Sequence, residues 1–278
     1  MTHNVGIMTI IYKYMCMRKM MILCGLLLAA VAAKADNNAL TELNGQKLSE
    51  TEKTDTLTLP VSICGQTTWT VVETAITLGE GEEERLAYEL KDFATHSQVR
   101  HQGRVFYLPS DLHDRIELLL EKVQTGSERR ACLIDNPTEK ALIIHTRGRT
   151  VLRNLVGMAI RSKGPLSIYG EEKDSLDLDN LITIYSTGKQ NRPTIEAFDE
   201  VSLQNLDIDM GGNRGTYGIR CIGNGKDETL LILNNVKGSI HAQRGAVSGF
   251  DIIEGTNCEL EGVELTIGNE KEEEEEKQ

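Results

Sequence analysis

Aspartates recur between the expected strands in the second half of the chain. Three of them are Asp199, Asp227 and Asp251. If those strands stack in register, the carboxylates lie about 4.8 Å apart, which is the spacing of neighbouring strands. Carboxylates at that distance repel one another unless a cation lies between them, and Ca²⁺ prefers oxygen ligands in a loose geometry. The spacing is compatible with a calcium site, and solvated acids on an exposed sheet are the simpler alternative.

A second polar set combines acids and arginines. Asp207 and Asp209 alternate with apolar residues, which predicts that both carboxylates point outward from a strand. Arg214 and Arg220 follow shortly afterwards, and a lyase that acts on a uronate sugar needs a basic residue beside the ring. These four residues form the candidate ligand-binding set. An arginine near acids is also common on any protein surface.

Signatures of other catalytic chemistries are weak. The sequence contains no His-Glu-x-x-His motif and no phosphate-binding glycine loop. Residues 245–249, Gly-Ala-Val-Ser-Gly, miss the Gly-x-Ser-x-Gly spacing of serine hydrolases by one residue. Acid pairs of the kind that glycoside hydrolases use are so frequent here that they carry little information. We therefore expect a protein without catalytic activity, and a polysaccharide lyase is an alternative.

The composition narrows the range of partners. The 278 residues carry a formal charge of −12, and aromatic residues make up 4% of the chain. A nucleic-acid-binding surface needs clustered basic residues to neutralise phosphates, so we expect no nucleic-acid partner. Few rings are present to stack on sugars, which favours a protein-binding surface over a sugar-binding one.

The N-terminal segment has the order of a secretory signal. Two basic residues precede an apolar run, residues 20–33, and the tripeptide Ala-Lys-Ala that ends at Ala35 supplies the small residues of a cleavage site. The run is shorter than the roughly 18–20 residues that span a bilayer. We therefore expect residues 1–35 to be a signal peptide, with translation starting near Met17. The mature chain is then secreted, periplasmic or on the cell surface, without a membrane span.

Four cysteines remain after such a cleavage, namely Cys64, Cys132, Cys221 and Cys258. In an exported chain they allow three disulfide pairings, and their positions in the sequence do not choose among these. They contain no Cys-x-x-Cys spacing, so a zinc site or a thioredoxin-like reaction has no support. Burial as free thiols is the alternative.

The mature chain divides by its periodicity. Residues 36–55 are polar and aperiodic, which is typical of a linker, and residues 56–147 indicate a small α+β unit. Its two expected helices follow apolar stripes at helical spacing in residues 86–93 and 110–123, with strands around them. Residues 270–278 are almost all charged and predict an acidic disordered tail.

Residues 148–269 follow a different pattern. Five variants of the phrase Leu-polar-Asn-Leu recur at intervals of about 25–30 residues. They begin at Leu152, Leu178, Leu203, Leu233 and Leu260. Alternating apolar residues and a second short strand with glycine corners follow in most repeats. We therefore predict a right-handed parallel β-helix of about five coils preceded by the small α+β unit. A leucine-rich repeat is the alternative, but its diagnostic Asn or Cys and its helical half are missing.

Part of this repeat region resembles a known family. The likeness is carried by Tyr217-Gly218-Ile219, by residues 230–236 (Leu-Leu-Ile-Leu-Asn-Asn-Val) and by residues 245–250 (Gly-Ala-Val-Ser-Gly-Phe). These segments resemble exported bacterial β-helix proteins labelled carbohydrate-binding-domain-containing, which are similar in fold to pectate lyases. The likeness covers residues 152–267, and its motif is structural. It implies a parallel β-helix that binds acidic polysaccharide with calcium.

From these features we expect an exported, non-catalytic binding module, with polysaccharide as its ligand and Ca²⁺ as a candidate cofactor. The first alternative is a structural or adhesive surface protein that binds other proteins. The second is a polysaccharide lyase. All of these expectations rest on fold-level analogy, and a fold does not determine a function.

Overall fold

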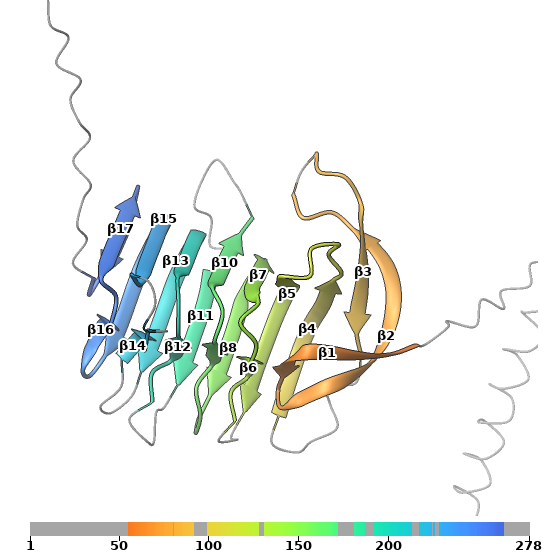
Figure 1. Ribbon diagram of the computed structural model, residues 1–278, viewed down its shortest axis with the longest axis horizontal. Helices are drawn as coiled ribbons and strands as arrows, with labels where there is room; N and C mark the ends of the chain where they lie inside the picture. The colour runs from red at the N-terminus through yellow and green to blue at the C-terminus, as the bar shows by residue number, and fades with distance from the viewer. Residues whose placement is uncertain are drawn as a thin grey trace, which may run out of the picture. The chain divides into compact units, whose positions relative to one another are not determined.

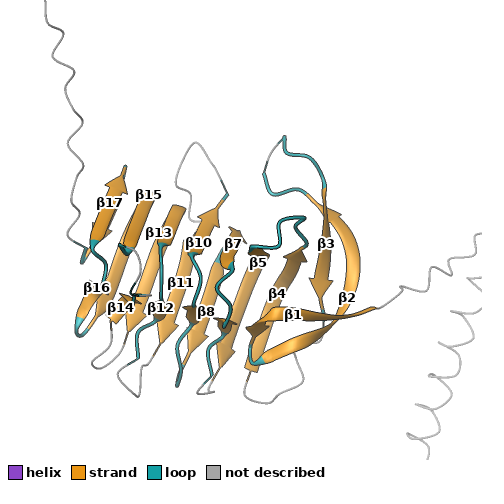
Figure 2. Ribbon diagram, in the orientation of Figure 1, coloured by secondary structure: helices purple, strands orange, loops and turns teal. Residues whose placement is uncertain are grey.

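The computed structural model describes residues 55–79, 81–91, 99–127, 131–171, 181–186, 192–212, 217–223, 225 and 228–263. These residues form strands and connecting segments, with no helix (Figure 2). The strands belong to one hydrogen-bonded sheet that winds into a β-solenoid of about five turns (Figure 1). The expected parallel β-helix is therefore confirmed. The signal peptide with Ala35, most of the expected linker and the acidic tail lie outside the described residues.

The strands are β1 (Asp55–Ile63), β2 (Gln66–Ile76), β3 (Arg85–Leu90), β4 (Val99–Leu108), β5 (Arg115–Ser127), β6 (Ile134–Asn136), β7 (Ala141–Arg147), β8 (Thr150–Asn154), β9 (Ile160–Ser162), β10 (Leu166–Gly170), β11 (Leu181–Ser186), β12 (Ile195–Ala197), β13 (Val201–Gly212), β14 (Tyr217–Cys221), β15 (Leu230–Ala242), β16 (Gly245–Ser248), β17 (Ile252–Thr256) and β18 (Glu259–Glu261).

The solenoid has three faces, each built from parallel strands of successive coils. Face A contains the first part of β5, then β7, β10, the first parts of β13 and β15, and β17. Face B contains the last part of β5, then β8, β11, the last parts of β13 and β15, and β18. Face C contains β6, β9, β12, β14 and β16. Equivalent residues of successive coils, such as Leu142, Leu166 and Val201, are therefore direct neighbours.

Alternate residues of each face point into a shared interior. In β7, Leu142 and Ile144 are buried, and Ile143 between them is half-buried. In β13, Leu206 and Ile208 are buried, whereas Asp209 is exposed. Leucine and β-branched side chains suit this arrangement because each packs against its counterpart one coil away.

An antiparallel meander precedes the coils. β1 and β2 form a hairpin whose turn residues, Cys64 and Gly65, both have positive φ, as a type I′ turn requires. β2, β3, β4 and β5 then pair in order, and β1 also pairs with β6. Trp69 and Val71 are buried in the same core as the coils. The meander therefore covers one end of the solenoid (Figure 1).

The expected α+β unit contains no helix among its described residues. The apolar stripes in residues 86–93 and 110–123 correspond to β3 and β5, so both helix predictions are wrong where the structure describes them. β5 pairs in parallel with β7 and β8. The solenoid therefore begins before residue 148, where we expected it to start.

The sequence of β5 looks like that of an amphipathic helix because both sides of this strand are buried. Leu118 and Leu120 face the main core. Leu119 points the other way and packs with Phe106 and Leu108 in a second cluster on the outer side of face A, where Ile76 at the end of β2 adds cover. A strand that is buried on both sides lacks strict apolar–polar alternation, and its period is therefore ambiguous.

A column of residues with positive φ forms the corner between faces A and B. Its described members are Lys122, Gly148, Asn205, Asn235 and Asn257. The Nδ2 of Asn235 donates to the Oδ1 of Asn205 at 3.0 Å, and the Nδ2 of Asn257 donates to the Oδ1 of Asn235 at 2.8 Å. Asparagine tolerates the left-handed conformation better than most residues. An asparagine ladder therefore fixes this corner on the last coils.

Two of the five repeated Leu-polar-Asn-Leu phrases supply asparagines of this ladder. Leu203 and Leu233 are paired, so their phrases occupy equivalent positions. Leu152 and Leu260 instead lie on face B, and the phrase that begins at Leu178 lies mostly outside the described residues. The predicted fold is right, but the predicted alignment of the repeats is wrong for the phrases at Leu152 and Leu260.

No disulfide joins the four cysteines that lie within the described residues. Cys64, Cys132 and Cys221 are buried, and Cys258 is half-buried. Burial raises the pKa of Cys132 to about 12 and also raises that of Cys221. Both thiols are therefore protonated at neutral pH and unsuited to nucleophilic chemistry.

Candidate binding site

The described members of the predicted ligand-binding set do not come together. Asp207 and Asp209 lie on the outer side of face B, as the alternation predicts. Arg220 lies on face C, beside Glu196. Arg214 lies outside the described residues. These acids and Arg220 therefore belong to two different faces of the solenoid.

The described members of the predicted calcium set, Asp199 and Asp251, lie near the corner between faces C and A. By extension of the strand register, Asp199 and Asp251 flank Thr229 on successive coils. The Asp251 carboxylate accepts hydrogen bonds from the backbone N–H and the hydroxyl of Thr229, both at 2.9 Å, and these lower its pKa. Asp227 lies outside the described residues. Within the described ranges, no group of three or more His, Cys, Asp or Glu side chains is placed to hold a metal ion.

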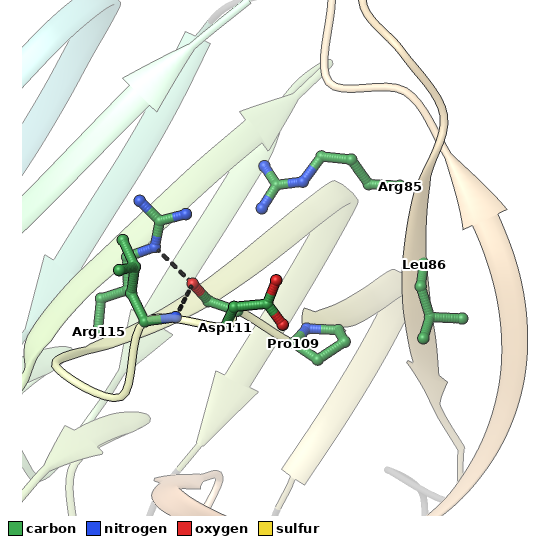
Figure 3. A pocket seen from close by; sticks show the side chains of 7 residues that line it. Arg85, Leu86, Pro109, Asp111 and Arg115 are labelled. Atoms are coloured by element: carbon green, nitrogen blue, oxygen red, sulfur yellow. Dashed lines mark hydrogen bonds between the residues drawn. The ribbon is translucent and has the colours of Figure 1, made fainter.

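A pocket of about 520 Å³ opens beside the start of β5. Figure 3 shows the guanidinium groups of Arg85 and Arg115 on two sides of this space, with the carboxylate of Asp111 close by. The side chains that line it come from β3, from the segment that joins β4 to β5, and from the first residue of β5. They include Arg85, Leu86, Ser110, Asp111, Leu112 and Arg115. We call this space the arginine pocket.

The turn after β4 positions Arg115. The Oγ of Ser110 accepts hydrogen bonds from the Nε of Arg115 at 3.0 Å and from the backbone N–H of Leu112 at 3.1 Å. The Nη2 of Arg115 is 3.7 Å from the Glu117 carboxylate, which is too long for a strong hydrogen bond. The terminal nitrogens of Arg115 therefore retain capacity to bind a ligand.

Glu117 positions Arg85. The two Nη atoms of Arg85 donate to the two carboxylate oxygens of Glu117 at 3.1 and 2.8 Å, and the Nε2 of His145 lies 2.7 Å from Oε1 of the same carboxylate. Burial alone would raise the pKa of Glu117, but the hydrogen bonds to His145 and Arg85 outweigh it and lower the pKa to about 2. The hydrogen bond to Glu117 also raises the pKa of Arg85. Both partners are therefore charged at neutral pH.

This arrangement suits an anionic ligand. A guanidinium group presents a planar set of donors that matches a carboxylate, and here both guanidinium groups are oriented before a ligand arrives. Leu86 and Leu112 line the same pocket and are 45% and 55% exposed, so they offer an apolar contact beside the charges. The pocket can therefore hold an acidic group that is attached to a less polar body.

Sequence reasoning missed the arginine pocket. Arg85 and Arg115 are far apart in the chain, and the antiparallel pairing of β3, β4 and β5 brings them together. The expected helices in residues 86–93 and 110–123 hid this pairing. One available signal was Glu117, a charged residue that interrupts the apolar residues at the start of β5.

Comparison of the chain with protein-family models, with curated proteins and with solved structures finds no match. Within the described residues, no helix is long and apolar enough to cross a membrane. The function must therefore be inferred from the solenoid and from the arginine pocket.

Proposed function

We propose that the protein is an exported, non-catalytic binding module for an acidic polysaccharide. The observation that supports this most is the arginine pocket, in which internal partners hold two guanidinium groups at an open space of about 520 Å³. Glu117 compensates one of the two positive charges, and the other remains available to a ligand.

A sugar acid fits the other groups of the pocket. Its carboxylate would pair with Arg85 and Arg115. The C–H face of its ring would lie against the exposed Leu86 and Leu112. Rows of stacked strands also expose long faces along the solenoid axis, and repeat proteins use such extended surfaces for binding.

Titration calorimetry with polygalacturonate tests the proposal on the mature chain. We expect Arg115→Gln to weaken binding at least about tenfold, since one charge-assisted contact contributes about 1.5–3 kcal/mol. Arg220→Gln on face C serves as the matched control and should bind like the wild type. Equal binding by wild type and Arg115→Gln, or no binding to any acidic glycan on an array, would contradict the proposal.

A second part of this test asks whether Ca²⁺ takes part in ligand binding. In direct binding, the exposed Asp111 repels the acidic ligand, so Asp111→Asn should strengthen binding about two- to fivefold. If Ca²⁺ instead bridges Asp111 and the ligand, the same variant should weaken binding, and a chelator should abolish binding by the wild type. Absorbance from unsaturated sugar products during the incubation would show a lyase rather than a binding module.

Export is tested separately. We propose that the chain is cut after Ala35, so the mature protein begins at Asp36. N-terminal sequencing of protein recovered from the medium, the periplasm and the cell surface measures this directly. Recovery of the uncut chain in the cytoplasm would contradict it.

A further inference from the structure

A second pocket, of about 490 Å³, lies at the corner between faces A and B on the first coils. It is distinct from the arginine pocket, since the two share no lining residue. Its lining includes Glu121, Lys122, Gln124, Arg147, Gly148 and Arg149. We call it the corner pocket.

Arg147 forms a fixed wall of the corner pocket. Its Nε donates to Glu171 at 2.8 Å, its Nη1 lies 3.5 Å from Glu121, and its Nη2 donates to the carbonyl oxygen of Thr77. Glu121 also pairs with Arg104 at 3.3 Å. The acids of this pocket are therefore already engaged by arginines of the protein.

Two further cationic side chains of the corner pocket, unlike Arg147, are not engaged by acids among the described residues of the protein. Lys122 and Arg149 are exposed, and neither forms an ion pair within the part of the chain that the structure describes. Together with Arg147 they outnumber the two acids of the lining. The lining of the corner pocket therefore carries an excess of positive charge, although the chain has a formal charge of −12.

The backbone at Lys122 is a second, independent observation. Lys122 has a φ of 50°, in the left-handed region, whereas the other described corner residues are glycine or asparagine. Lysine is unfavourable in this conformation. Its Cγ lies 2.9 Å from the position that a Cβ on Gly148 would occupy, so the lysine stem lies over a glycine. A strained residue that persists where asparagine would fit better is typical of a functional site.

We propose that Lys122 and Arg149 bind a second acidic group, so that the ligand is a polyanion that contacts both pockets. This inference rests on the proposed function. Arg115 and Lys122 lie near opposite ends of the face A part of β5, which places the pockets about 23 Å apart at roughly 3.3 Å per residue. The loop after β2 crosses between them, since Thr77 contacts Arg147 and Leu78 packs near Leu119. The ligand therefore passes over this loop and is bound mainly at the arginine pocket and at the corner pocket.

A length series of oligogalacturonides tests this inference by calorimetry. A chain that reaches both pockets should bind the wild type at least about tenfold more tightly than a trimer, because the second contact is intramolecular. The double variant Lys122→Asn/Arg149→Gln should lose this gain and still bind the trimer like the wild type. Lys163→Gln, an exposed lysine elsewhere on the solenoid, is the charge control and should retain the gain.

The single variant Lys122→Asn supplies a readout that does not depend on binding. Relief of the unfavourable backbone conformation should raise the melting temperature by about 2–4 °C while the long oligomer binds more weakly. If the double variant retains the full length dependence while Arg115→Gln loses binding, the second contact is wrong and the proposed function stands. If Arg115→Gln also binds every oligomer like the wild type, both are wrong.

Discussion

At the scale of single residues, the arginine pocket depends on a buried carboxylate. The side chain of Glu117 is 5% exposed, and a charge at such a position is costly unless it is paired. Arg85 and His145 supply that pairing at 2.7–3.1 Å. The same contacts hold the guanidinium group of Arg85 at the pocket, so stability and ligand binding share one carboxylate.

We expect acid to weaken the fold through Glu117. Its pKa of about 2 in the folded protein lies below the value of about 4.3 in an unfolded chain. Its stabilising contribution is therefore complete above about pH 5 and is lost as the pH falls toward 2. Glu117→Gln should flatten this decline and lower the free energy of unfolding at pH 7 by about 2–4 kcal/mol. Urea unfolding at several pH values measures both effects.

Glu259→Gln is the control for this prediction. Glu259 is 79% exposed and lies 4.0 Å from Lys237, and exposed pairs of this kind contribute little. The variant should follow the wild-type pH dependence. A Glu117→Gln profile that also overlays the wild type would show that Glu117 is not the group that titrates.

At the scale of strands, the sequence pattern predicts correctly a strand that is buried on one side only. It gives a wrong prediction for a strand that is buried on both sides. β13 places Leu206 and Ile208 inside and Asp209 outside, so its apolar–polar alternation can be recognised in the sequence. β5 is covered on its outer side by residues from the meander, and Leu119 is as buried as Leu118. That cover comes from tertiary packing, which a local pattern does not contain. The arginine pocket was missed for the same reason.

The double burial of β5 has a measurable consequence. We expect Leu118→Ala and Leu119→Ala each to lower the free energy of unfolding by about 2–5 kcal/mol, because each deletes a fully buried side chain. Leu112→Ala, at a residue that is 55% exposed, should change it by less than about 0.5 kcal/mol. Chemical denaturation measures all three. A small effect at Leu119 alone would contradict the second cluster.

Substitutions in the asparagine ladder can separate two contributions to stability, namely the positive-φ backbone conformation and the side-chain hydrogen bonds. Asn235→Gly retains a residue that accepts positive φ and removes the side-chain hydrogen bonds, whereas Asn235→Ala loses both advantages. We expect the alanine variant to be less stable than the glycine variant by about 1 kcal/mol. Thermal unfolding measures the difference. Equal stability of the two variants would mean that the backbone conformation costs nothing at this position.

At the scale of the whole molecule, the two ends of the solenoid differ. The meander covers the first coil, with Trp69 and Val71 in the common core. On the last coil, β17 and β18 each pair with β15 alone among the described strands, and Ile252 is exposed. In a solenoid each coil is stabilised by its neighbours, so a coil with one described neighbour has the weaker support.

Hydrogen exchange should follow this difference. We expect the backbone amides of β10 and β13 to exchange slowest and those of β17 and β18 to exchange faster by at least about tenfold, because the last strands open locally at lower free energy. Mass spectrometry of exchanged peptides measures it. Equal protection of β13 and β17 would show that further chain covers the last coil.

The pairing of Val201 with Leu231, and of each neighbouring residue with its counterpart, makes one coil interchangeable with the next. Duplication of the segment between two such counterparts would lengthen the protein while every existing pair kept an equivalent partner. The reach of its surface can thus change in whole-coil increments during evolution or engineering, without redesign of either end.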